Sequence, residues 1–136
     1  MNNSVLTVFF VTADNYLEGT IPTEIVALSE FRELCLGENR LQETIPTEIG
    51  RLTNLTRLGL YDNELVGMIP TEFGRLTMLS RLDLKGNSLS GVIPSELGKL
   101  TDLGKHETLR VHLLALLLHK TNHSHTFTLP LSNWIV

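Results

Sequence analysis

Residues 63–79 of the chain read NELVGMIPTEFGRLTML. Twenty-four positions earlier, residues 39–55 read NRLQETIPTEIGRLTNL, and twenty-four positions later, residues 87–103 read NSLSGVIPSELGKLTDL. A fixed period between about 20 and 50 residues indicates a repeat protein, in which every unit stacks on its neighbours. The sequence therefore predicts one elongated array of similar units.

Several independent sets of residues keep this period. The Ile-Pro pairs are Ile21-Pro22, Ile45-Pro46, Ile69-Pro70 and Ile93-Pro94, and the asparagines are Asn15, Asn39, Asn63 and Asn87. The pattern predicts about four units over residues 1–103, with unit two beginning at Phe31 and unit three at Leu55. The first unit is degenerate, because Thr12 stands where unit two has Leu36.

The third unit carries a recognisable motif. Residues 55–65 read LTRLGLYDNEL, which matches L-x-x-L-x-L-x-x-N-x-L, and Val66 to Pro70 continue it with a G-x-I-P variant. The chain resembles the plant-type leucine-rich-repeat family and is similar to the ectodomains of receptor-like kinases. That resemblance implies an α/β fold: a short right-handed solenoid with parallel strands on one wall and short helical or 3-10 turns on the other.

Alternation along each short strand divides the side chains into two sets. The inward columns are expected to be Phe31/Leu55/Leu79/Leu103, Leu34/Leu58/Leu82 and Leu36/Leu60/Leu84. The outward positions are expected to be Glu33, Cys35, Gly37, Arg57, Gly59, Tyr61, Arg81, Asp83 and Lys85. Asn15, Asn39, Asn63 and Asn87 are expected to form a structural ladder, since an amide both donates to and accepts from turn backbone.

The other wall is expected to start at the prolines. Proline is favoured at the first helical position, and glycine often ends a helix. Pro46, Pro70 and Pro94 are therefore predicted to begin short turns, and Gly50, Gly74 and Gly98 to end them.

Residues 104–136 differ from the repeats. They hold three Lys/Arg and one Glu, which gives a net charge of +2. Residues 1–103 hold eight Lys/Arg and fourteen Asp/Glu, which gives a net charge of −6. We expect a non-repeat tail after Leu103, with a helix near 107–120 that folds back as a cap or lies at a membrane surface. The spacing of His119, His123 and His125 raises a zinc site as an alternative to solvated histidines, but the sequence favours no metal and no cofactor.

Composition narrows the function. The net charge of −4 disfavours nucleic acid as a partner, and no apolar run approaches the length of a membrane span. No catalytic motif is present, so we expect no enzyme. Val5–Val11 is interpreted as a degenerate first strand rather than a convincing signal peptide. The compartment stays open, although the resemblance implies an extracellular or membrane-associated protein.

By the same resemblance, the chain is expected to be a protein- or peptide-binding module of a receptor-like signalling protein. Its ligand-binding residues would be Glu33, Arg57, Tyr61, Arg81, Asp83 and Lys85 on the concave strand face. The alternative is a structural fragment of a longer array, or a truncated gene model, with no ligand of its own. Such a fragment would associate with itself through its exposed repeat ends.

Overall fold

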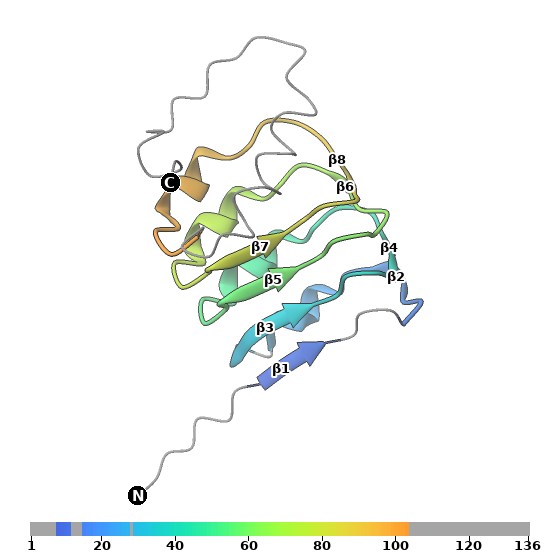
Figure 1. The fold of residues 1–136 in the computed structure, drawn as a ribbon, viewed down its shortest axis with the longest axis horizontal. Helices are drawn as coiled ribbons and strands as arrows, with labels where there is room; N and C mark the ends of the chain where they lie inside the picture. The colour runs from blue at the N-terminus through green and yellow to red at the C-terminus, as the bar shows by residue number, and fades with distance from the viewer. Residues whose placement is uncertain (1–7, 12–14, 28, 104–136) are drawn as a thin grey trace, which may run out of the picture.

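The structure is a computed structural model that describes residues 8–11, 15–27 and 29–103. In this part the chain winds as a coil, with one turn for each unit of the sequence (Figure 1). Strands line one wall and short helices line the opposite wall, as the repeats predict. The tail, its expected helix near 107–120 and the tail histidines lie outside the described residues.

The main wall is a four-stranded parallel sheet in the order β1-β3-β5-β7. Its strands are β1 (Val8–Val11), β3 (Phe31–Cys35), β5 (Arg57–Gly59) and β7 (Arg81–Asp83). Leu34 pairs with Leu58, and Leu58 pairs with Leu82, so equivalent residues of successive units lie side by side. The predicted parallel wall is confirmed, and the degenerate first unit contributes its edge strand.

Two smaller parallel sheets flank the main wall, and the sequence analysis did not foresee them. Strand β2 (Glu18–Thr20) pairs with β4 (Arg40–Gln42), and β6 (Val66–Gly67) pairs with β8 (Ser88–Leu89). All four strands follow the turn at the repeated asparagine. Pairing in these two- and three-residue strands holds the second limb of each unit against its neighbour.

Within the described residues, the opposite wall consists of four 3-10 helices. They are η1 (Thr23–Ala27), η2 (Thr47–Arg51), η3 (Thr71–Arg75) and η4 (Ser95–Lys99). The prediction that proline is the first helical residue is wrong by one position. Pro46 has φ −62° and ψ 134°, an extended conformation, and its carbonyl accepts the Ile49 N–H at 3.2 Å. Proline is thus the cap residue, whose carbonyl accepts the first bond before its own dihedrals become helical.

Glycine does not end these helices, which corrects a second prediction. Gly50, Gly74 and Gly98 all lie inside their helices. A Cβ on Gly50 would lie 2.5 Å from the carbonyl oxygen of Glu72, and one on Gly74 would lie 2.6 Å from the Cβ of Glu96. Glycine is therefore required because the next helix passes directly against it, not because the backbone changes direction.

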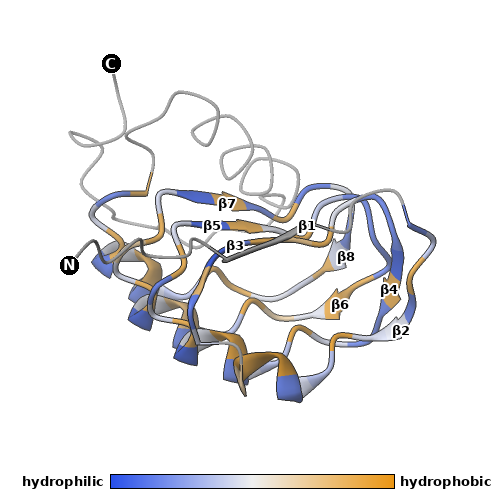
Figure 2. Cartoon of the chain, turned by 90° about the horizontal axis from the view of Figure 1, so that it is seen from below, coloured by the Kyte–Doolittle hydropathy of each residue, from blue (hydrophilic) through white to orange (hydrophobic). Residues whose placement is uncertain are grey.

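The core fills the space between the walls. The three predicted leucine columns are buried from unit two to unit four. Leu52, Leu76 and Leu100 join them from the end of each helix, and Phe73 is completely buried from η3. Figure 2 shows hydrophobic and hydrophilic positions recurring at matching places in successive turns. Because each unit covers its neighbour's apolar side chains, the array holds one continuous core.

Candidate binding surface

The sheet face consists of the outward positions of β3, β5 and β7 and of the residues that directly follow these strands. Glu33, Arg57 and Arg81 lie in one row across it. The strand register pairs Glu33 with Arg57 and Arg57 with Arg81. Arg57 Nη1 lies 3.6 Å from Glu33 Oε2, and both side chains remain partly exposed. A pair of this kind contributes little to stability in water. Arg81 forms no ion pair within the described residues, so its guanidinium is available to a partner.

The second row is Cys35, Gly59 and Asp83. Cys35 was predicted to face outward in the open, but it is only 5% exposed. A Cβ on Gly59 would lie 3.7 Å from Cys35 Sγ and equally far from Tyr61 Cδ1, so thiol and ring border the same small gap. Burial raises the pKa of the Cys35 thiol, while Arg57 and Arg81 act in the opposite direction. The thiol is therefore packed and largely neutral rather than presented to a ligand.

The third row is Gly37, Tyr61 and Lys85. Gly37 was also expected to be open, yet it is buried because the Tyr61 ring occupies the place of any side chain there. Burial raises the pKa of Tyr61, and the charge of Glu38 and a hydrogen bond with it raise it further. Lys85 is exposed, and its backbone N–H donates to Asp83 Oδ1 at 3.2 Å.

The sheet face therefore brings together all six predicted ligand-binding residues. Tyr61 is half-buried and held against a glycine, whereas Arg81 and Lys85 reach solvent. A fixed aromatic ring beside unpaired cations gives large contact area together with directional donors. Such an arrangement suits a protein or peptide surface, which offers carbonyls and carboxylates as acceptors.

The repeated asparagines connect successive units rather than facing a ligand. Asn63 Oδ1 accepts the Leu41 N–H at 2.9 Å, and its Nδ2 donates to the Leu36 and Leu60 carbonyls at 2.9 and 3.2 Å. Asn39 and Asn87 make equivalent bonds, with oxygen acceptance at 3.0 Å in each case. At Asn15 the backbone N–H donates to Asn39 Oδ1 at 3.2 Å. The ladder thus pairs turn backbone that the sheets leave without partners.

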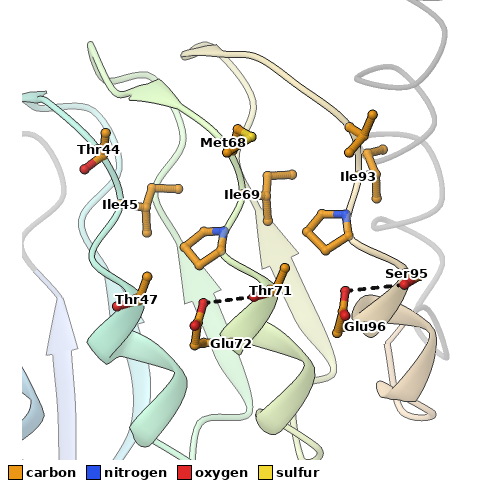
Figure 3. A pocket seen from close by; sticks show the side chains of 13 residues that line it. Thr44, Ile45, Thr47, Met68, Ile69, Thr71, Glu72, Ile93, Ser95 and Glu96 are labelled. Carbon is orange, nitrogen blue, oxygen red and sulfur yellow. Dashed lines mark hydrogen bonds between the residues drawn. The ribbon is translucent and has the colours of Figure 1, made fainter.

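A groove on the flank, between β6/β8 and the helices, was missed by sequence reasoning. It has a volume of about 830 Å³ and crosses units two to four (Figure 3). Among its lining residues, Met68 and Val92 are 64% and 72% exposed, whereas Ile69 is buried. The sequence did carry a signal for this groove in the residue that precedes each Ile-Pro pair. That residue is apolar in units three and four, as Met68 and Val92, and polar in unit two, as Thr44.

The carboxylates in this groove have local partners. Thr71 Oγ1 donates to Glu72 Oε2 at 3.2 Å, and Ser95 Oγ donates to Glu96 Oε2 at 3.4 Å, as the dashed lines in Figure 3 mark. These contacts repeat with the helices and belong to their first turns. We call this groove the flank groove. It is a second open surface, whose lining combines the exposed apolar side chains of Met68 and Val92 with hydroxyl groups and two carboxylates.

Two negative findings concern the described part of the chain. No group of three or more metal-binding side chains occurs within residues 8–11, 15–27 and 29–103. Over the same residues, no helix is long and apolar enough to cross a membrane.

Comparison with known proteins identifies the repeats. Residues 29–89 match the family model described as Leucine rich repeat, and these residues belong to that family. Solved structures add the subtype: the chain is similar to the ectodomains of plant leucine-rich-repeat receptor kinases, as the motif predicted. A search of curated proteins gave no match.

Three of these structures show the extent of the similarity. A chain in the BIR3–SERK2 complex from Arabidopsis thaliana is 44% identical, with a TM-score of 0.63 over 65% of this chain and 48% of that one. The plant peptide hormone receptor RGFR1, in complex with RGF2, is 42% identical, with a TM-score of 0.69 over 70% of this chain and 15% of the receptor. The ectodomain of GASSHO1/SCHENGEN3 from Arabidopsis thaliana, in complex with CASPARIAN STRIP INTEGRITY FACTOR 2, is 41% identical. Its TM-score is 0.69 over 70% of this chain and 11% of that one. The chain therefore spans about half or less of the proteins it matches.

Proposed function

We propose that the chain is a non-enzymatic recognition module that binds a protein or peptide through the sheet face. The observation that carries this proposal is the row of Glu33, Arg57 and Arg81, with Tyr61 two rows further along the same face. Arg and Tyr are the residue types that dominate binding energy at interfaces. Here Arg57 and Arg81 lie on β5 and β7, and Tyr61 follows β5 with its ring against Gly37, so little conformational entropy is lost when a partner binds.

The similar solved structures support the same class of partner. RGFR1 and GASSHO1/SCHENGEN3 were each solved in complex with a peptide or protein factor, and the BIR3–SERK2 structure is a complex of two proteins. Within this class, the mixture of Arg81 and Lys85 with Glu33 and Asp83 favours a ligand that presents both charges. A receptor-like role in signalling follows as part of the proposal.

A competing surface is the flank groove, where Met68 and Val92 are exposed. Apolar exposure of this kind often marks an interaction site. It lacks unpaired cations and an anchored aromatic ring among its lining residues, which is why the sheet face is the stronger candidate. A structural fragment without any ligand is the remaining alternative.

A random peptide library displayed on phage tests the proposal with the full chain as bait. Binders are then remeasured against a sheet-face variant, Tyr61→Ala/Arg81→Ala, and a flank-groove variant, Met68→Ser/Val92→Ser. We expect the sheet-face variant to weaken binding by about tenfold or more, which corresponds to 1.4 kcal/mol, and the groove variant to leave it unchanged. The opposite pattern assigns binding to the flank groove, and a library without specific binders supports the structural fragment.

A further inference from the structure

Exposed apolar side chains gather in the flank groove and beside it. Six large hydrophobic side chains are exposed in the described residues, and three of them, Val66, Met68 and Val92, lie on this flank. Met68 and Val92 line the groove at equivalent positions of units three and four, and Val66 belongs to β6. Single exposed apolar residues are ordinary, but a group of them around a hollow is typical of an interaction site.

The side chain of Met68 connects two units of the array. A Cβ on Gly91 would lie 2.7 Å from Met68 Cγ and 3.1 Å from its Sδ, so the thioether lies against the backbone of unit four. Methionine is unbranched and polarizable, and it packs against partners of different shapes. The apolar part of the groove is therefore continuous across units three and four and able to adapt to a partner.

The ionisable side chains that line the groove are both acidic. They are Glu72 and Glu96, which are half-buried, and neither forms an ion pair within the described residues. Each accepts one neighbouring hydroxyl on Oε2, and a carboxylate has further lone pairs for other donors. Arg75 and Lys99 stand in the last turns of the same helices and do not pair with them. A partner that buries these carboxylates must supply cations, because an unpaired buried charge is costly.

We propose that the flank groove docks an extended segment of a partner protein in which apolar residues alternate with Lys or Arg. Successive side chains of an extended chain point in opposite directions, so such a segment presents apolar groups to one side and cations to the other. Met68 and Glu72 are four residues apart, so their Cα atoms lie within about 14 Å of each other. Figure 3 shows Glu72 and Glu96 at the beginnings of neighbouring helices, with Met68 on the segment that leads into one of them.

The sheet face differs from the groove in charge, so the two surfaces suit different partners. Arg81 and Lys85 are cations of the sheet face that reach solvent, whereas the lining of the groove contains no cation in the described part of the chain. Charge complementarity therefore directs a basic segment to the groove. The two surfaces share no residue, and docking in the groove does not depend on the proposed ligand of the sheet face.

The probe for this site is a blocked hexapeptide, acetyl-Leu-Lys-Leu-Lys-Leu-Lys-amide, added to the full chain. A matched peptide has glutamate in place of each lysine. Methyl NMR of the methionines locates binding, because Met68 lines the groove and Met78, which is 43% exposed, lies outside it. Since a hexapeptide contacts little surface, we expect a dissociation constant of about 0.1 mM, which is too weak for phage selection to retain.

Two variants separate the apolar and acidic parts of the groove. Met68→Ser/Val92→Ser removes the exposed apolar side chains, and Glu72→Gln/Glu96→Gln removes the charges while it keeps the shape of the side chains. Amide NMR titrations of each full chain with the lysine peptide measure the affinities. We expect each variant to weaken binding by about fivefold or more, and the glutamate peptide to bind the unaltered chain at least about tenfold more weakly.

The control variant is Glu24→Gln/Glu30→Gln, which makes the same change in charge at exposed residues outside the groove. It should change the affinity by less than about twofold. The proposal is overturned if the lysine peptide does not bind, if the glutamate peptide binds equally well, or if the control weakens binding as much as Glu72→Gln/Glu96→Gln. It is also overturned if the Met68 methyl signal shifts with protein concentration in the absence of peptide, because a second copy would then occupy the groove.

Discussion

The helical wall and the sheet face of the same coil differ in how much their sequences vary from unit to unit. On the helical wall, units two to four read IPTEIG, IPTEFG and IPSELG. On the sheet face, the first outward positions are Glu33, Arg57 and Arg81, and the last are Gly37, Tyr61 and Lys85. The helices contact each other so closely that Gly50 has no room for a methyl group. Sequence is therefore restricted where units touch and free where side chains meet solvent.

Two aromatic residues give the largest contrast. Phe73 is completely buried in η3, whereas Tyr61 is half-buried on the sheet face. Phe73→Ala should lower the free energy of unfolding by about 3–5 kcal/mol, because it removes a large side chain and leaves a cavity. Tyr61→Ala should cost about 1 kcal/mol. Urea denaturation measures both, and equal losses would mean that the two walls are not energetically distinct.

The asparagine ladder gives the next effect. Asn63→Ala should cost about 1–3 kcal/mol, because it leaves the buried Leu41 N–H without its acceptor and removes one of the two side-chain donors to the Leu36 carbonyl. Asn87→Ala should cost less, since Asn87 is half-buried and water replaces part of its bonding. The thermal unfolding midpoints of the two variants measure which substitution lowers stability more. An equal or larger effect at Asn87 would contradict the interior role of the ladder.

Two glycines compare the walls directly. Gly74→Ala should destabilise the chain by about 1–3 kcal/mol, because the new Cβ meets Glu96 Cβ at 2.6 Å and its carbonyl oxygen at 2.8 Å. Gly59→Ala should change stability by less than about 1 kcal/mol in either direction, since its Cβ meets only ordinary contacts at 3.7 Å. Urea midpoints compare the two variants, and equal shifts would contradict the tighter packing at Gly74.

The smallest effect is a gain. Gly19, Gly67 and Gly91 have φ of +87°, +80° and +84°, and Glu43 occupies the same register with φ +62°. A non-glycine residue in this region is strained by about 1–2 kcal/mol, so Glu43→Gly should stabilise the chain by up to about 1 kcal/mol. A rise in the thermal midpoint is expected. No rise, or a fall, would show that the Glu43 backbone carries no strain.

The period of the sequence was enough to predict the stacking of units, because inward leucines must meet equivalent leucines. The period was not enough to predict the burial of Cys35 and Gly37. Alternation along the strand gave their outward direction correctly, but it did not show that neighbouring side chains cover them. The burial of Gly37 depends on Tyr61, which lies one unit away and covers it. Gly50 and Gly74 were misassigned for a similar reason: helix-ending glycine and close-contact glycine look alike in a single unit. The flank groove depends on spacing between units, which no single repeat encodes.

The most direct test of the central claim is one variant measured twice. Arg57→Ala/Tyr61→Ala/Arg81→Ala removes the anchors of the sheet face while leaving the helical wall intact. We expect its urea-unfolding free energy to fall by no more than about 2 kcal/mol, and its affinity for library-selected peptides to fall by about thirtyfold or more. Unchanged affinity in a folded variant would contradict the assignment of recognition to the sheet face.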